Sequence, residues 1–252
     1  MPSAREINRR IKSVTNTQQI TKAMKMVSSV RLRRAQERAL ATAPYTEKME
    51  GMLRRLSAAS PDSGNPLFQS RDDVKKTCYI IIGADKGLAG AFNANINKTM
   101  VSVLKDKPQL INAQEIAHLA TQKFLDGEVD EVYVIYTHFK TALSQEAKIV
   151  KMLPISQEEQ AGDQGPREEY LFAPDASRVL DSLLPQYLDL FIYNSLLQSA
   201  ASELGARMTA MTSATDNAGE LIEKLTVTYN KVRQAGITNE LTETVSGANA
   251  LK

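Results

Sequence analysis

The sequence predicts a mixed α and α/β fold, in which long N- and C-terminal helices pair as an antiparallel coiled coil and a small α/β domain is inserted between them. Three observations predict this arrangement. The C-terminal stretch keeps a regular seven-residue spacing of seam positions, and the N-terminal stretch from Ser3 to Ala43 contains neither Gly nor Pro. The middle of the chain instead carries short apolar runs rich in β-branched residues, which are typical of buried strands.

The C-terminal stretch from Phe191 to Lys252 contains the clearest periodicity in the chain. Its steps alternate between four and three residues, which is the spacing of a long helix that packs along another helix. The positions are Leu197, Ala201, Leu204, Met208, Met211, Thr215, Ala218, Ile222, Leu225, Tyr229 and Val232. From Arg233 the sequence stays helix-like but becomes polar, so we expect this helix to extend beyond its partner and to project into something else.

The N-terminal stretch predicts a second long helix. Ser3 and Glu6 form a capping box, and forty uninterrupted residues would make a rod of about 60 Å. A four-three pattern starts at Ile7, Ile11 and Val14 and continues onto Gln18, Thr21, Lys25 and Ser28, while Ile20, Met24, Val27 and Val30 follow a neighbouring track. Two interpretations stay open: several neighbours bury this helix, or one side packs on its mate and another side touches a different chain.

The breaks in the sequence divide the chain into three parts. The spacing of apolar residues after Pro44 extends the first helix to about Ala59, and the run SPDSGNP at 60–66 is a strong break. We therefore expect an N-terminal coiled-coil helix at 1–59, an α/β globular domain at 67–175 and a C-terminal coiled-coil helix at 176–252. Pro185 should kink the last helix or separate two helices.

The middle part predicts an α/β layer. Residues 77–82 form a continuous apolar run, typical of a parallel strand buried on both faces. The run GADKGLAG at 83–90 leads into a helix, residues 116–125 form another helix, and residues 131–136 and 148–154 form further strands, the last at an edge. The order of strand, helix and strand indicates a Rossmann-like domain. Residues 157–167 are expected to form a polar loop.

Composition and charge exclude several classes of protein. The single cysteine, Cys78, permits no intrachain disulfide and indicates a reducing compartment. No run approaches 18 apolar residues, so we expect no membrane span, and the first residues lack the apolar core of a secretory signal. Residues 1–40 hold ten Lys or Arg and two acids. This asymmetry favours a basic arm that meets an acidic partner.

The sequence indicates no active site. The turn at 83–90 does not fit the spacing of a phosphate loop or of a dinucleotide-binding loop, which favours a structural role. His118 and His138 have no second ligand nearby, and Cys78 lies inside a strand, where a thiol usually packs as a small apolar residue. We therefore expect no catalytic residue, no metal and no cofactor.

The residues alone leave three functions open. The basic helix could bind nucleic acid, but its Lys and Arg are spread around the helix and no aromatic residue accompanies them. The chain could also be a coiled-coil adaptor or, because a strand precedes a Gly-containing turn, a nucleotide-binding enzyme. Intrinsic ATPase activity or tight nucleotide binding by the isolated chain would favour the enzyme.

Both ends of the chain carry specific motifs of one family. Residues 5–36, centred on ITKAMKMV at 20–27, resemble the N-terminal signature of the gamma subunit of F-type, proton-transporting ATP synthases. Residues 202–250 resemble its C-terminal signature: ARM-x-AM, then A-x-D-N-A, then N-K-x-RQA-x-IT-x-EL. GADKGLAGAFN and GEVDEVYVIY in the middle also match, so that the resemblance covers nearly the whole chain.

The resemblance implies a central-stalk rotor subunit that performs no chemistry itself. Such a subunit couples proton-driven rotation of the c-ring to conformational cycling of the catalytic beta subunits during ATP synthesis or hydrolysis. Its implied partners are the hexameric ring of alpha and beta subunits, the epsilon subunit and the c-ring, with no nucleic acid. The implied location is the cytoplasmic side of a bacterial plasma membrane, as a peripheral part of the complex.

The resemblance also implies partner-binding residues. Met24 and Lys25 look like the neck positions that face an acidic beta-subunit loop, and Arg207 lies near that level. Arg233, Gln234, Thr238 and Glu240 resemble upper positions that catch a beta-subunit loop. Tyr170 lies in the segment implicated in c-ring contact, although Ala173 stands where the family often has an acid.

Two further departures from the family pattern are visible. The family normally has another strand and turn where Leu110-Ile111 runs directly into a helix. Either the chain lacks a strand, or the sequence omits a disordered stretch, and we favour the omission. The cysteine-bearing insert of the chloroplast subunits is also absent, so thiol regulation of that kind is not expected.

Overall fold

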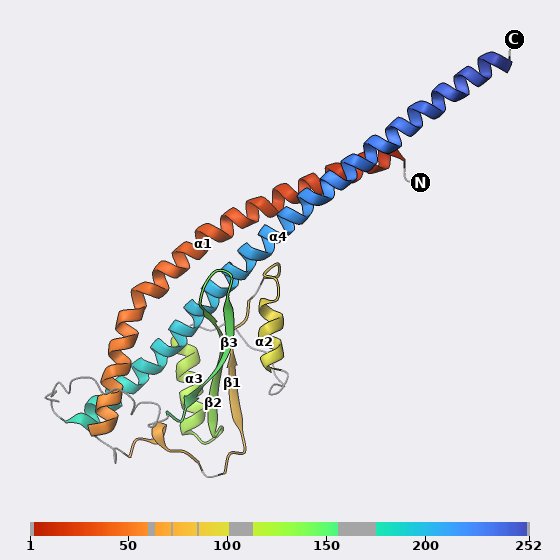
Figure 1. Ribbon diagram of the computed structural model, residues 1–252. Helices are drawn as coiled ribbons and strands as arrows, with labels where there is room; N and C mark the ends of the chain where they lie inside the picture. The colour runs from red at the N-terminus through yellow and green to blue at the C-terminus, as the bar shows by residue number, and fades with distance from the viewer. Residues whose placement is uncertain are drawn as a thin grey trace. The chain divides into compact units, whose positions relative to one another are not determined.

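The computed structural model describes residues 3–59, 64–71, 73–84, 86–100, 113–155 and 175–250 (Figure 1). Two long helices, α1 (Ala4–Ala59) and α4 (Ala176–Ala250), lie at the two ends of the chain. Between them come the 3₁₀ turn Pro66–Phe68, strand β1 (Thr77–Ile81), helices α2 (Phe92–Met100) and α3 (Ala113–Leu125), and strands β2 (Glu131–Phe139) and β3 (Gln145–Leu153). The predicted order of elements is therefore confirmed.

The chain forms two compact units, and each long helix contributes to both. Residues 1–29 and 207–252 make up the first, which we call the helical unit. Residues 30–206 make up the second, which we call the globular unit. The Ser3 hydroxyl accepts a hydrogen bond from the Glu6 amide at 3.3 Å, as the capping box predicts, whereas the Glu6 carboxylate pairs with Arg10.

In the helical unit α1 and α4 run antiparallel. The Thr21 and Thr215 hydroxyl oxygens lie 2.8 Å apart, and the Gln18 side-chain amide donates to the Thr215 carbonyl at 3.4 Å. A Cβ at Gly219 would lie 3.1 Å from the Gln18 amide nitrogen, so glycine leaves room for this side chain where it crosses α4. Residue numbers therefore rise along α1 from Gln18 to Thr21 while those of the facing residues on α4 fall from Gly219 to Thr215.

The predicted seam of α4 faces α1. From Leu221 to Asn249 the shielded residues are Ile222, Leu225, Tyr229 and Val232, which are the seam positions, and every other residue in that range is exposed. On α1 the shielded positions include the polar continuation of the seam, with Thr21 only 8% and Ser28 only 3% exposed. Short polar side chains therefore fill the middle of the seam.

We call the contact of Gln18 and Thr21 with Thr215 the polar lock. Each threonine hydroxyl has one proton and also lies near a carbonyl of its own helix, Gln18 for Thr21 and Met211 for Thr215. One hydroxyl therefore donates within its helix while the other donates across the seam. A polar pair inside an apolar seam disfavours shifted alignments, because a shift leaves its groups unpaired.

Both internal prolines lie within continuous helix. Pro44 lies inside α1 and Pro185 inside α4. The alternative in which Pro185 separates two helices is therefore wrong. A proline removes one intrahelical hydrogen bond, and nearby side chains supply others: Thr46 donates to the Thr42 carbonyl, and Ser182 to the Val179 carbonyl.

The globular unit contains a mixed three-stranded sheet in the order β1-β2-β3. β1 pairs parallel with β2 from Thr77–Glu131 to Ile81–Ile135, and β2 pairs antiparallel with β3. The prediction of β3 as an edge strand is confirmed. The prediction that β1 is buried on both faces is wrong: its five residues are all half-buried, because β1 is the other edge among the described strands.

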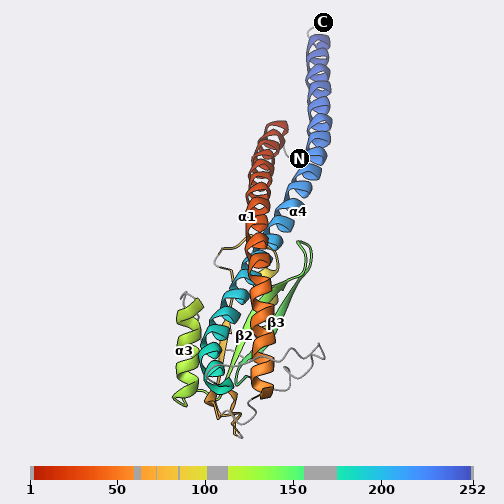
Figure 2. The same ribbon diagram turned by 90° about the vertical axis from the view of Figure 1, so that its left-hand side faces the viewer.

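Helices cover both faces of the sheet (Figures 1 and 2). One core cluster joins the end of α1, α3 and the first half of α4 to one face, with Leu53, Phe124 and Leu188 among its buried residues. A smaller cluster joins α2 to the other face through Phe92, Ile96 and Ile135. Val134 and Ile135 belong to different clusters because consecutive strand residues point to opposite faces.

An arginine–aspartate pair fixes the turn between α3 and β2. The Arg71 guanidinium donates to Asp130 at 2.7 Å and to the Phe124 carbonyl at 2.8 Å. Asp130 also accepts from the main-chain amides of Lys75 and Lys76, both at 2.8 Å. The Arg71 hydrogen bond and these two amides hold the pKa of Asp130 at about 2. The segment before β1 is thereby tied to the segment before β2.

The polar lock gives the first testable expectation. Replacing Thr21 or Thr215 with valine keeps the volume but removes a hydroxyl, and the remaining partner loses its contact. The double variant should therefore lose about 1 kcal/mol less than the sum of the single losses. The measurement is a double-mutant cycle of unfolding free energies from urea titrations. Strictly additive losses would show that the two hydroxyls do not interact.

The Asp130 pair gives a pH-dependent expectation. Because its pKa in the folded chain is about 2, below the ordinary 3.8, its contribution to stability is complete above about pH 5 and is lost as the pH falls through about 2. Asp130→Asn should be less stable than the wild type at pH 7, and the difference should shrink on acidification. Thermal unfolding between pH 7 and pH 2 measures this. Asp73→Asn is the control, because Asp73 is exposed and pairs only with Lys75.

Candidate partner-binding surface

Several apolar side chains of α1 are exposed, whereas its seam is partly polar. Ile20 and Met26 are each 60% exposed and Val27 is 52% exposed, while Thr21 beside them is buried. Leaving such residues in water forgoes the free energy that their burial would provide, roughly 1.5–3 kcal/mol per side chain. This pattern favours the interpretation in which α1 packs on α4 with one side and meets a different chain with another.

Three of the residues expected to bind a partner gather at one level of the helical unit. Met24 and Lys25 are half-buried on α1, and Arg207 is half-buried on α4. The pairing of Thr21 with Thr215 places Lys25 roughly opposite Met211, about one turn from Arg207. We call these three residues the collar. Among the described ion pairs, none involves Lys25, so its charge remains available to a partner.

The other expected residues lie where α4 has no mate. Every residue from Arg233 to Asn249 is exposed, and we call this segment the tip. The antiparallel pairing explains it, because α1 begins at Ala4 and its first turn lies near Val232. Ile237, Leu241 and Val245 recur every four residues along the tip and are all exposed. The other residues of the tip are polar, except for Ala235, Gly236, Gly247 and Ala248.

The four candidate residues of the tip cover about half of its circumference. At about 100° per residue, Arg233 and Glu240 share one side, and Gln234 and Thr238 share the adjacent side. The Thr238 hydroxyl donates to the Gln234 carbonyl at 3.0 Å and keeps its acceptor lone pairs free for another group. About 39 Å of helix separates Arg207 from Arg233, so the collar and the tip are two distinct surfaces.

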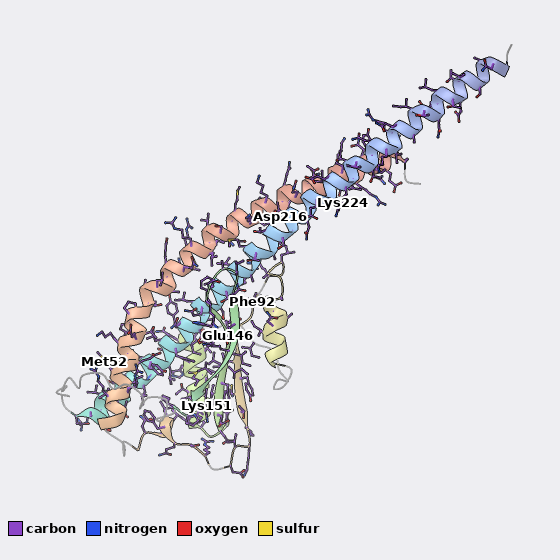
Figure 3. All side chains as sticks on the ribbon, viewed as in Figure 1. Met52, Phe92, Glu146, Lys151, Asp216 and Lys224 are labelled. Carbon is purple, nitrogen blue, oxygen red and sulfur yellow. The ribbon has the colours of Figure 1, made fainter. Side chains whose placement is uncertain are left out.

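Charged side chains line α4 between the collar and the tip. Figure 3 shows Asp216 and Lys224 on this stretch, and Lys224 pairs with Glu220 one turn away at 3.9 Å. This ion pair is exposed and contributes little to stability. Tyr170, the remaining expected residue, lies outside the described residues, as do Ala173, the loop at 157–167 and the junction at Leu110.

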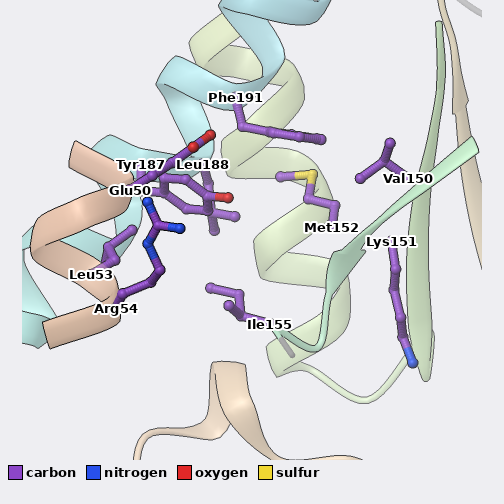
Figure 4. Close-up of a pocket in the computed structure, with 10 residues that line it drawn as sticks. All are labelled: Glu50, Leu53, Arg54, Val150, Lys151, Met152, Ile155, Tyr187, Leu188 and Phe191. Carbon is purple, nitrogen blue, oxygen red and sulfur yellow. The ribbon is translucent and has the colours of Figure 1, made fainter. Parts of the chain in front are cut away.

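The globular unit has a pocket of about 150 Å³ between α1, β3 and α4 (Figure 4). Arg54 and Glu50 come from α1 and Tyr187 from α4, whereas the Lys151 ammonium binds Glu131 at 2.7 Å. The other lining residues are Leu53, Val150, Met152, Ile155, Leu188 and Phe191. The described lining contains no Ser, Thr, Cys or His.

The other side chains that could take part in chemistry have surroundings that fit a structural role. Asn93 bonds both the amide and the carbonyl of Ala84, at 2.9 and 3.0 Å, which braces the turn after β1. Burial raises the pKa of the Cys78 thiol, which keeps it protonated. Burial also lowers the pKa of His138, helped by Lys148 and Lys140. Within the ranges that the structure describes, no three metal-ligating side chains come together.

The sequence did not reveal a set of polar residues on α4 that binds the sheet. Gln198, Ser199 and Ser202 hydrogen-bond to the main chain of β2 at Thr137 and Phe139. Their only signal is the presence of short polar side chains in a helix whose neighbours are apolar. Among the described helices, none is long and apolar enough to cross a membrane.

Comparison with known proteins identifies the family. A family model described as ATP synthase matches residues 3–110 and 99–251. The ATP synthase gamma chain of Desulforamulus reducens is 42% identical over 285 positions, and that of Heliobacterium modesticaldum is 42% identical over 292 positions. Each alignment covers the whole of this chain and the whole of its relative.

Solved structures show the same fold. A chain of the Tetrahymena thermophila mitochondrial ATP synthase central stalk and c-ring is 25% identical, with a TM-score of 0.54 over 77% of this chain and 99% of that one. A chain of the Euglena gracilis mitochondrial ATP synthase, from an assembly of OSCP, F1 and c-ring, is 19% identical, with a TM-score of 0.66 over 98% of this chain and 94% of that one.

The alignments also bear on the junction at Leu110. The alignment of 285 positions exceeds the 252 residues of this chain by 33, and the two matches of the family model overlap at residues 99–110. The sequence itself runs without a break from Leu110 to Ile111. The sequence therefore lacks positions that this relative has, and both interpretations of the junction stay open. Family model and full-length relatives agree, and the chain belongs to the family of ATP synthase gamma chains.

Proposed function

We propose that this chain is the central-stalk rotor of an F-type ATP synthase, which couples rotation of a proton-driven c-ring to the conformational cycle of catalytic beta subunits. The proposal rests on family membership and on one structural observation. A paired, register-locked helical unit ends in a single helical tip that is exposed along its whole described length from Arg233 to Asn249. An isolated helix of this kind gains its stability from packing against something else.

The collar and the tip would serve as two separate contacts with the ring of alpha and beta subunits. At the collar, Lys25 and Arg207 would face an acidic loop of a beta subunit beside the apolar contact of Met24. At the tip, Arg233, Gln234, Thr238 and Glu240 would grip a beta-subunit loop. Exposed charge pairs are worth less than about 1 kcal/mol each, so such contacts can be made and broken as the shaft turns.

Asymmetry would let the shaft drive the catalytic sites. A rotor shifts a site between conformations only if its orientations have different interaction free energies with those conformations. The apolar residues Ile20 and Val27 lie on one side of α1 and polar residues lie elsewhere, which supports such a difference. The chain would perform no chemistry itself and would need no cofactor.

The globular unit would contain the foot that meets the epsilon subunit and the c-ring. We infer that it is a Rossmann-like α/β domain, supported by the parallel pairing of β1 with β2 across α2 and α3. Residues 1–59 and 176–252 would form the coiled coil, with residues 67–175 as the foot and Tyr170 towards the c-ring. The complex would lie peripherally on the cytoplasmic side of a bacterial plasma membrane.

Co-purification tests the proposed function. The chain, tagged at its native locus, should copurify with alpha, beta and epsilon subunits and with the c-ring from detergent-solubilised membranes. The purified complex should pump protons when supplied with ATP. Recovery of the chain without alpha and beta subunits would contradict the rotor and favour an adaptor. Recovery with nucleic acid instead would favour the basic-arm alternative.

Met24→Lys tests the collar. It places a second positive charge beside Lys25 where an apolar contact is proposed, so ATP-driven proton pumping should fall several-fold while assembly and ATP hydrolysis remain close to wild type. Met24→Leu, which keeps the apolar volume, is the matched control. The measurement is the ratio of pumping to hydrolysis in reconstituted vesicles, and an unchanged ratio for Met24→Lys would remove the collar assignment.

Truncating two side chains tests the tip. Arg233→Ala combined with Gln234→Ala should reduce ATP hydrolysis by the complex several-fold, with no change in the unfolding midpoint of the isolated chain, because both residues are exposed. Asn239→Ala, exposed on the other side of the same helix, is the control. Equal losses for both variants would indicate a general effect on the tip instead of specific contacts at Arg233 and Gln234.

A further inference from the structure

Among the described strands, none lies beside the second half of β2 on the side where β1 lies. β1 pairs with β2 only as far as Ile135, whose carbonyl accepts from the Ile82 amide at 2.9 Å. Main-chain groups of alternate strand residues point to the same side. The amides of Thr137 and Phe139 therefore point to the same side as Ile135, where no described strand continues.

Side chains of α4 replace the missing strand. The Thr137 amide donates to the Ser199 hydroxyl at 3.1 Å, and the Ser202 hydroxyl donates to the Thr137 carbonyl at 3.1 Å. One turn earlier on α4, the Gln198 side chain accepts from the Phe139 amide at 3.1 Å. We call these three hydrogen bonds the sheet clamp.

Two of the three hydrogen bonds of the sheet clamp are buried. Ser202 is fully buried, and Ser199 and Thr137 are each only 4% exposed. Water cannot readily replace a bond lost at these positions, and a buried main-chain group without a partner costs about 1–3 kcal/mol. The clamp therefore holds β2 and α4 in one alignment, because any slip between them would break both buried hydrogen bonds together.

Gly205 brings the β2–β3 hairpin against the same stretch of α4. A Cβ at this position would lie 3.3 Å from the Gln145 amide nitrogen and 3.4 Å from both the Ala142 carbonyl oxygen and the Phe139 ring. The Gln145 amide in turn donates to the Ala142 carbonyl at 2.7 Å, which stiffens the hairpin. A larger residue than glycine would push the hairpin away from α4.

The clamp lies close to the boundary between the two units. Residues 198–205 belong to the last turns of α4 in the globular unit, which ends at Ala206, and the helical unit resumes at Arg207. Nearer its start, α4 has an exposed hydrogen bond to the rest of the unit, which the Asn65 side-chain amide donates to Asp181 at 2.6 Å. There α4 packs on the globular core through apolar residues such as Leu188 and Ile192. Such contacts are strong but non-directional, whereas the hydrogen bonds of the clamp have a fixed geometry.

We propose that Gln198, Ser199 and Ser202 are positioning residues that fix the sheet of the globular unit to α4, so that torque on the foot turns the shaft helix instead of being lost as slip between sheet and helix. This inference rests on the proposed rotor function. It assigns a mechanical task to three polar residues that contact neither the collar nor the tip.

Ser199→Ala with Ser202→Ala removes two bonds of the clamp without adding volume. Ser195→Ala is the matched control, because Ser195 is equally buried but donates only to the Phe191 carbonyl of its own helix. At the third bond, Gln198→Met removes the acceptor and Gln198→Glu keeps it. Gly205→Val adds volume on α4 at the position where the β2–β3 hairpin packs against it.

The test uses the complete ATP synthase in vesicles with two readouts. Hydrogen exchange of the Thr137 and Phe139 amides reports the clamp, and the ratio of ATP-driven proton pumping to ATP hydrolysis reports coupling. The double serine variant should exchange the Thr137 amide at least tenfold faster and lose at least fivefold in pumping against an imposed gradient, with hydrolysis within twofold of wild type. Gln198→Met and Gly205→Val should lose coupling, whereas Ser195→Ala and Gln198→Glu should retain it.

Three results would overturn the clamp. These are unchanged exchange in the double serine variant, faster exchange with unchanged pumping, and an equal loss of pumping in Ser195→Ala. Failure of the proposed rotor function looks different: the wild-type complex would then not pump at all, while the exchange measurement would still report whether α4 holds β2.

Discussion

The antiparallel contact between α1 and α4 is the interaction on which the helical unit depends. Two helices alone bury little surface, so their seam must determine both stability and alignment. Thr21 and Ser28 occupy buried positions where a leucine would provide more hydrophobic stabilisation. The hydroxyl contact between Thr21 and Thr215 and the approach of Gln18 to Gly219 instead restrict how the helices can slide. The seam thus favours a fixed alignment over maximal burial.

The polar seam also explains the outer surface of α1. Because Thr21 and Ser28 face α4, the apolar residues Ile20 and Val27 remain exposed on another side of the helix. In a chain that worked alone, this arrangement would waste apolar surface and invite aggregation. In a gamma chain it is consistent with a shaft whose outer sides differ chemically, which is the property that the proposed rotation requires.

α4 combines several tasks because it belongs to both units. Its first turns complete the apolar core of the globular unit, Ser199 and Ser202 replace a neighbouring strand for β2, and Ile222 to Val232 form the seam with α1. The tip then continues without a mate. β1, by contrast, has no second neighbour among the described strands. The alignment with one relative has 33 more positions than this chain has residues.

The sequence by itself determined the long helices, the seam of α4, the three strands and the family, because periodicity and local motifs are encoded in consecutive residues. It also indicated the candidate residues of the collar and the tip, although only through family resemblance. Tertiary structure decided what depends on contacts between distant segments. It showed that Thr21 is buried against Thr215 while Ile20 is exposed, that β1 is an edge strand and therefore only half-buried, and that α4 passes through Pro185 as one helix. It also revealed the bonds from Ser199 and Ser202 to β2, because no local pattern states which main-chain groups another strand will leave unpaired.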